Sequence, residues 1–301
     1  MSERIRVGTR RSTLARAQTD TVLRKLRRLA PSRTFEAVGV DTSGDQDRSV
    51  GSSPDFTDAI DRALVKGEID LAVHSAKDLP VVLDRRFALW ASPPRVDPRD
   101  CLVMESDRAA AGLVRGARVG SSSSRRRAQL LRWRPDLTVL EVRGNVDTRI
   151  SRVRAGDIDA AILAVAGVRR LGRSQEISQI LPSDDFVPAP AQGALAIVGR
   201  EGDPELARLV RRLNHAPTLT AVRAERAFAG ALGGDCEVPL GCVATVRGAS
   251  LSVVGEVLTP DGRTRLRGIG TGRTSSPESV GAALGRQLLD RGADELLRKR
   301  R

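Results

Sequence analysis

The stretch RIRVGTRRSTLARAQTDTVLRKLRRL, residues 4–29, decides the fold. It begins with a short apolar run that is typical of a strand, and from Ser12 to Leu29 it has the amphipathic character of a helix. A buried strand followed directly by such a helix is the first half of a βαβ unit. The N-terminal region therefore predicts an α/β domain.

The same alternation continues along the chain. IDLAVHS, residues 69–75, is a second predicted strand, and the helical segment 56–67 before it ends at Gly67. After the proline-rich segment 92–99, strands are predicted at ARVGSS (117–122), TVLEVRG (138–144) and DAAILAVAG (159–167), with helices between them. We expect mostly parallel sheets, a hinge near residues 92–99, and a shared architecture for the first two domains.

The C-terminal third has a different pattern. A predicted helix at 219–232 leads to the glycine-rich GGDCEVPLGC, and strands at 248–258 and 264–272 are joined by the hairpin-like TPDGR. A last helix is expected from Ser276 to the C-terminus. These features predict a small α+β domain.

Composition limits the classes of partner. The chain of 301 residues has a formal charge of +13, carried almost wholly by arginine, which favours an acidic partner. Aromatic residues make up 2% and tyrosine is absent, whereas proteins that read nucleic acids usually stack bases on aromatic side chains. We therefore expect no nucleic-acid partner.

Cysteine usage and the N-terminus bear on location and metals. The 3 cysteines form no CxxC pair and only 2 histidines accompany them, which disfavours a zinc site and favours a reducing compartment. The first residues lack the apolar core of a signal peptide, and no run approaches the ~18 apolar residues of a membrane span. We expect a cytoplasmic protein without a metal or a membrane partner.

Arginine recurs where predicted strands end. Arg10, Arg143 and Arg149 follow such strands, and in GSSSSRRRAQL, residues 120–130, serines suited to a helix N-cap precede three arginines. Cations are unfavourable at a helix N-terminus unless an anion is present. A single arginine is better explained as solvated surface. The set, at the sheet edge where α/β proteins bind ligands, predicts a ligand with several acidic groups.

The strand IDLAVHS delivers a different group: His74, Ser75, Lys77 and Asp78. Asp78 is a lone carboxylate among cations, so we expect it to stay ionised and to stabilise a developing positive charge. The alternative, that Asp78 pairs with Lys77 or a nearby arginine, is equally compatible with the spacing. His74 is interpreted as a packing residue.

Cysteines divide into two kinds. Cys101 and Cys242 are expected to be small buried apolar side chains, whereas Cys236 lies among glycines that leave its thiol accessible. The residues alone leave open whether Cys236 reacts.

Eight blocks resemble one family over nearly the whole chain, in the same order. They are GTRRSTLARAQ, DLAVHSAKDLP, DPRDCLV, GSSSSRRRAQL, LEVRGNVDTR, AAILAVAGVRRLG, PAPAQGALAI and ERAF…LGGDCEVPLG, and they resemble porphobilinogen deaminases, also called hydroxymethylbilane synthases. The resemblance implies two α/β domains built like periplasmic binding proteins, which close around the active site, and a third that carries a cysteine. We expect domain 1 at 1–94 with 194–212, domain 2 at 99–188 and domain 3 at 216–301.

The resemblance also implies a reaction and its residues. A monomeric enzyme would join four porphobilinogen molecules with loss of ammonia, on a dipyrromethane cofactor held by a thioether to Cys236. Asp78 matches the catalytic aspartate, which would stabilise the cation formed when ammonia leaves. Cofactor-binding positions are matched by Ser75, Lys77, Ser121, Ser123, Arg125 and Arg126, and substrate-binding positions by Arg10, Ser12, Phe56, Arg143, Arg149 and Gln192.

Some positions depart from the family pattern. GSSPDF, residues 51–56, has Ser53 where a lysine is expected, and Ala191 and Val198 stand where glycine and glutamate are common. The acidic neighbour in GGDC should raise the thiol pKa of Cys236. These departures keep two alternatives open: a paralogue that catalyses a different condensation or deamination on an acidic amine, and a two-lobed protein that only binds an anion.

Overall fold

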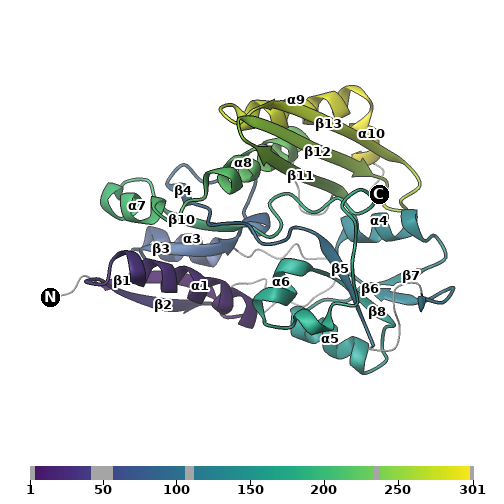
Figure 1. Ribbon diagram of the computed structural model, residues 1–301, viewed down its shortest axis with the longest axis horizontal. Helices are drawn as coiled ribbons and strands as arrows, with labels where there is room; N and C mark the ends of the chain where they lie inside the picture. Colours follow the sequence, from purple (N-terminus) through teal and green to yellow (C-terminus); the bar gives the residue numbers. More distant parts are fainter. Residues whose placement is uncertain (1–3, 42–56, 106–111, 234–237, 299–301) are drawn as a thin grey trace. The chain divides into compact units, whose positions relative to one another are not determined.

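The computed structural model describes residues 4–41, 57–105, 112–233 and 238–298 (Figure 1). The chain divides into two compact units, the first made of Met1–Val96 and Ala194–Leu219 and the second of Asp97–Gly193 and Thr220–Arg301. The division after Val96 falls in the proline-rich segment where a hinge is predicted. The three-domain boundaries stay a prediction.

The first unit contains a five-stranded sheet with the order β2-β1-β3-β10-β4. Strand β1 pairs in parallel with β2 and β3, whereas β10 runs antiparallel to both β3 and β4. The strands are β1 (Arg4–Arg10), β2 (Thr34–Val40), β3 (Leu71–Ser75), β4 (Phe87–Ala91) and β10 (Leu195–Arg200).

Helix α1 (Thr13–Leu29) covers this sheet with an apolar face. Its residues Val22, Leu23 and Leu26 are buried in one core with Val7 of β1 and Leu71 of β3. The helix begins where predicted because the Ser12 hydroxyl accepts a hydrogen bond from the backbone N–H of Ala15 at 3.3 Å. The other helices of the unit are α3 (Asp58–Val65), the 3₁₀ helix η1 (Ala76–Asp78) and α7 (Pro204–Arg211).

The second unit contains a five-stranded sheet with the order β7-β6-β8-β5-β9. Strand β6 pairs in parallel with β7 and β8, and β5 is antiparallel to β8 and β9. Its elements are β5 (Asp100–Met104), β6 (Arg118–Gly120), α4 (Ser124–Trp133), β7 (Thr138–Leu140), α5 (Val146–Arg154), β8 (Ala160–Ala164), α6 (Val165–Arg170), η3 (Ser174–Glu176) and β9 (Gln179–Ile180). The pairing pattern repeats that of the first sheet, so the expected shared architecture is present.

The expectation of mostly parallel sheets needs a correction, because each sheet has two antiparallel pairings. All residues of β5 are buried, and so is nearly all of β10. A strand buried on both faces has the same unbroken apolar run in either direction. The sequence pattern therefore does not reveal the direction of these strands.

The C-terminal part holds an antiparallel sheet with the order β11-β12-β13. Its elements are α8 (Ala216–Ala231), β11 (Leu240–Arg247), β12 (Ser250–Leu258), β13 (Arg265–Arg273), α9 (Pro277–Asp290) and α10 (Ala293–Arg298). Figure 1 shows α9 lying along β12 and β13. The α+β prediction is confirmed, although β11 was not predicted and the last helix is two helices, interrupted at Gly292 with φ +88°.

Within the described ranges, no helix is both long enough and apolar enough to cross a membrane.

Candidate active site

The carboxyl edge of the first sheet gathers one group of predicted residues. Strands β1 and β3 are parallel, with Gly8 opposite Ala72, so their last residues, Arg10 and Ser75, lie at the same edge. Helix η1 follows β3 without a break and carries Lys77 and Asp78. The topology thus brings four of the predicted site residues to one edge.

Asp78 is half-buried. Among the residues that the structure describes, no side chain forms an ion pair or hydrogen bond with its carboxylate. The pairing with Lys77 that the spacing allowed is therefore not observed, and the carboxylate is available to a ligand.

Two serines of this group are already engaged within the chain. The Ser75 hydroxyl accepts a 2.8 Å hydrogen bond from Nε2 of Gln18, a buried residue of α1. The Ser12 hydroxyl caps α1. Both are fixed in place, and their roles toward a ligand stay a prediction.

His74 is buried in β3, in agreement with its interpretation as a packing residue. Burial lowers its pKa to about 4, and the charge of Arg10 acts in the same direction. Its Nε2 has no hydrogen-bond partner among the described residues. The imidazole is therefore neutral at physiological pH.

A second group lies at the edge of the other sheet where β6, β7 and β8 end. Strand β5 is antiparallel to β8, with its first residue Asp100 opposite Ala164, the last residue of β8. An antiparallel strand begins where its parallel neighbours end. Asp100 is consequently placed beside the serines that follow β6 and the first turn of α4.

Asp100 is fully buried and binds both predicted arginines. Its Oδ2 accepts from Nη1 of Arg125 at 2.8 Å, and its Oδ1 accepts from Nη2 of Arg126 at 2.7 Å. Gln192 adds a 2.9 Å bond from Nε2 to Oδ1. The two guanidinium groups hold the pKa of Asp100 well below its usual range although burial opposes them.

The serines before α4 form hydrogen bonds that shape the start of the helix. Ser123 is the N-cap, and its hydroxyl accepts from the backbone N–H of Arg126 at 3.4 Å. The hydroxyl of buried Ser121 accepts from the backbone N–H of Ser123 at 3.2 Å. The predicted N-cap is thus confirmed.

Sequence reasoning missed Asp100. It expected the anion near the arginines to come from a ligand, and the protein itself supplies one carboxylate. A signal existed in DPRDCLV, where an aspartate opens an otherwise apolar strand, since a charge at that position needs a buried partner. Two guanidinium groups on one carboxylate still leave an excess of positive charge.

Three other arginines differ in whether a carboxylate of the described residues balances their charge. Arg149 donates to the Gly144 carbonyl and the Ser122 hydroxyl, and burial together with the charge of Arg126 lowers its pKa to about 10. Arg143 forms an ion pair with Glu141, with 2.7 Å between Nε and Oε1. Arg170, which was not predicted, donates to the Gly193 carbonyl, and burial lowers its pKa to about 10.

Some predicted features lie outside the described residues: Phe56 with the GSSPDF loop, and Cys236. Cys101 and Cys242 are buried, as expected, and neither forms a disulfide with a described residue. Burial, with Asp100 nearby, raises the pKa of the Cys101 thiol to about 12, which makes it a poor nucleophile.

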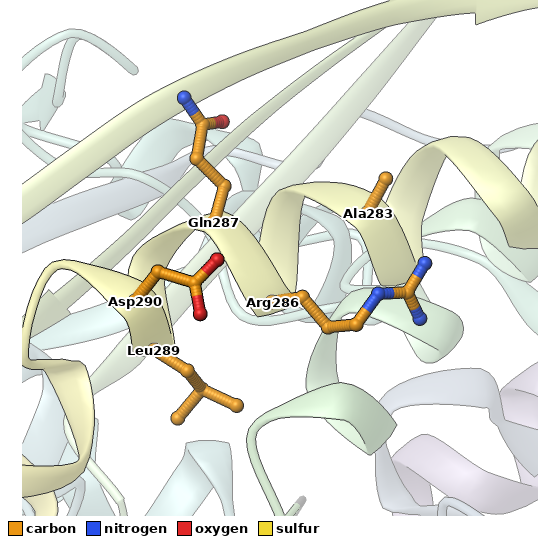
Figure 2. A pocket seen from close by; sticks show the side chains of 5 residues that line it. All are labelled: Ala283, Arg286, Gln287, Leu289 and Asp290. Atoms are coloured by element: carbon orange, nitrogen blue, oxygen red, sulfur yellow. The ribbon is translucent and has the colours of Figure 1, made fainter.

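Two other features bear on the site. Among the described residues, no three His, Cys, Asp or Glu side chains gather as metal ligands would. A shallow pocket on α9 is lined by Ala283, Arg286, Gln287, Leu289 and Asp290, and Figure 2 shows all of them projecting from that one helix. It contains none of the predicted site residues.

Known proteins resemble this chain over nearly its whole length. Residues 5–208 match a family model described as porphobilinogen deaminase, dipyrromethane cofactor binding domain, and residues 219–290 match the C-terminal domain of the same family. A porphobilinogen deaminase of Moorella thermoacetica is 43% identical over 98% of this chain and 96% of that protein. One of Thermus thermophilus is 42% identical over 97% of each.

One solved structure of low sequence identity aligns with part of this chain. The periplasmic VFT2 domain of Bordetella pertussis BvgS is 19% identical and aligns with a TM-score of 0.43 over 70% of this chain and 86% of that domain.

Proposed function

Since this chain belongs to the porphobilinogen deaminase family and is a transferase of that family, we propose that its arginines bind the carboxylates of porphobilinogen and of a dipyrromethane cofactor. Each pyrrole unit carries an acetate and a propionate, so a growing chain needs many cationic contacts. The residues assigned to the cofactor are Ser75, Lys77, Ser121, Ser123, Arg125, Arg126 and Cys236, and those assigned to the substrate are Arg10, Ser12, Phe56, Arg143, Arg149 and Gln192.

The observation that carries this proposal is the imbalance of charge around Asp100. Arg125 and Arg126 share that single carboxylate. The guanidinium of Arg149 lies near enough to Arg126 to feel its charge, and it has no carboxylate partner among the described residues. Buried cations normally have matching anions. A polycarboxylate ligand would supply the missing negative charge.

A second observation concerns the fit of the cofactor. The buried Nε of Arg125 has no hydrogen-bond partner in the described part of the chain. A buried N–H donor without an acceptor costs about 1–3 kcal/mol, which an oxygen of a bound carboxylate would remove. The residues present therefore fit an acidic cofactor. When bound to Cys236, the dipyrromethane supplies the primer to which porphobilinogen units are joined.

Asp78 is assigned the catalytic role. Loss of ammonia leaves positive charge on the substrate, and a fixed carboxylate close to that charge stabilises the transition state. The Asp78 carboxylate has no ion pair with the described residues that would neutralise it. In this proposal Asp78 also assists proton transfer at the pyrrole nitrogen. We further propose that the enzyme is a cytoplasmic monomer.

The mass of the purified protein tests this assignment. Apoprotein incubated with porphobilinogen should gain an adduct of two pyrrole units that stains for pyrrole. Cys236→Ser should gain none, whereas Cys242→Ala, which changes a buried cysteine, should gain it normally. Wild-type protein that stays unmodified would rule out the transferase assignment. Ligand binding should also weaken as salt rises, because salt screens the arginine contacts.

A further inference from the structure

A buried glutamine connects the predicted cofactor site to the C-terminal sheet. Gln129, on α4, accepts a 2.8 Å hydrogen bond from Nη1 of Arg125 through Oε1. Its Nε2 donates to Oε1 of Glu256 at 2.8 Å and to the carbonyl of Val187 at 2.8 Å. Gln129 is 1% exposed and Glu256 is fully buried. Glu256 belongs to β12, 127 residues further along the chain.

Chemistry fixes the direction of this glutamine. A guanidinium has only donors, so it requires the amide oxygen of Gln129. Glu256 offers an acceptor oxygen whether or not it is protonated, so it takes the amide N–H. An exchange of the amide oxygen and nitrogen would place donor against donor and acceptor against acceptor. The chain Glu256–Gln129–Arg125 therefore has one stable arrangement, and Glu256 helps to impose it.

One further contact involves Glu256, and another joins the C-terminal sheet to α4. Oε2 of Glu256 lies 3.7 Å from Nη1 of Arg265 on β13. At the tip of the β12–β13 hairpin, Gly262 has φ +72°, and a Cβ atom there would lie 2.2 Å from the carbonyl oxygen of Ala128. The hairpin backbone thus lies directly against α4. The sheet that presents Glu256 is fixed relative to the helix that carries Arg125.

We propose that Glu256 and Gln129 are positioning residues for the dipyrromethane subsite, which fix Arg125 and the first turn of α4 from the C-terminal sheet. The proposal rests on the function proposed above, in which Arg125 binds the cofactor. In the sequence, the proposed attachment residue Cys236 precedes β11, which belongs to the same sheet as Glu256.

The experiment measures how fast each apoprotein gains the adduct from porphobilinogen, by intact mass. Gln129→Glu places two carboxylates against each other and should slow loading about tenfold. The double variant Gln129→Glu with Glu256→Gln exchanges the two side chains, so the carboxylate lies next to Arg125 and the new amide N–H at position 256 can donate to it. Its loading rate should therefore return to within about threefold of wild type. Loading of Gln129→Glu at the wild-type rate, or no recovery in the double variant, would overturn the proposal.

Controls separate positioning from stability and from the underlying function. Leu288→Val, a truncation of a buried leucine in α9, should lower the melting temperature and leave loading unchanged. Arg125→Met tests the function itself: if it loads normally, Arg125 does not bind the cofactor. If Arg125→Met does not gain the adduct and Gln129→Glu gains it at the wild-type rate, only the positioning role is wrong. Should Gln129→Glu not fold, Gln129→Met removes the same acceptor and should slow loading similarly.

Discussion

Nε2 of Gln18 donates a 2.8 Å hydrogen bond to the hydroxyl of Ser75. Gln18 is on the buried face of α1, and Ser75 is the last residue of β3, directly before the helix that carries Lys77 and Asp78. The bond joins α1, which covers the first sheet, to the end of β3, directly before the 3₁₀ helix that carries the candidate catalytic residue Asp78. Packing of α1 and geometry of the site are therefore coupled.

Replacing Gln18 by leucine should remove the hydrogen bond that fixes the Ser75 hydroxyl at the end of β3. The loss of one hydrogen bond lowers the free energy of unfolding by about 1 kcal/mol. The Ser75 hydroxyl becomes free to rotate, so we expect slower cofactor loading as well. Denaturant titration and intact mass measure the two effects. Thr21→Ala, which removes a hydroxyl bond on the same helix, is the control, and equal loading in the two variants would contradict the coupling.

Asp78→Asn should slow turnover without unfolding the protein. The substitution keeps the size of the side chain and removes the charge, so the rate should fall by about 100-fold or more. The melting temperature should be unchanged, because the carboxylate has no partner among the described residues whose loss would destabilise the fold. Asp84→Asn, on an exposed pair with Arg86, is the control for a lost surface charge. Unchanged turnover in Asp78→Asn would refute its catalytic role.

His74 should make the protein sensitive to mild acid. Its pKa is about 4 in the folded chain and 6.5 when unfolded, so between these values only the unfolded state binds the proton. Stability is therefore lost as the pH falls from 6.5 toward 4, by about 3 kcal/mol in total. His74→Leu should flatten this part of the stability profile. The slope should survive in His215→Gln, and a profile in which His74→Leu keeps it would exclude this explanation.

The fold was largely predictable because its elements have strong local signals. Residues 4–29 form the expected strand and helix, and the helix before β3 ends before Gly67, which has φ +67°. Strand direction was not predictable for β5 and β10. A fully buried strand carries no periodic signal, and its partners are set by contacts far apart in the sequence.

In the site, too, contacts between neighbouring residues could be predicted, whereas contacts between residues far apart in the sequence could not. Ser123 caps α4 as predicted, since an N-cap depends on neighbouring residues. The partner of Arg125 and Arg126 was missed, because Asp100 reaches them only through the antiparallel pairing of β5 with β8. The contact between Gln129 and Glu256 was missed for a similar reason: Gln129 lies in GSSSSRRRAQL, but its partner is 127 residues away in the sequence.

Ala191 is the one non-glycine residue with positive φ in the described part of the chain, at +60°, and the family resemblance predicts glycine at this position. Its backbone N–H donates to Oε2 of the buried Glu225, whose Oε1 accepts from the backbone N–H of Ala244. This carboxylate holds the turn in the left-handed region. The same turn places Gln192 where its Nε2 donates a hydrogen bond to Asp100.

Ala191→Gly should therefore stabilise the protein. A left-handed conformation costs an L-residue about 1–2 kcal/mol, and glycine avoids this cost while it loses more chain entropy on folding. We expect a net gain of about 0.5–1 kcal/mol in the free energy of unfolding, measured by denaturant titration. Ala194→Gly, at a buried position without positive φ, should instead cost about 0.5–1 kcal/mol. If both substitutions destabilise the chain equally, Ala191 is not strained.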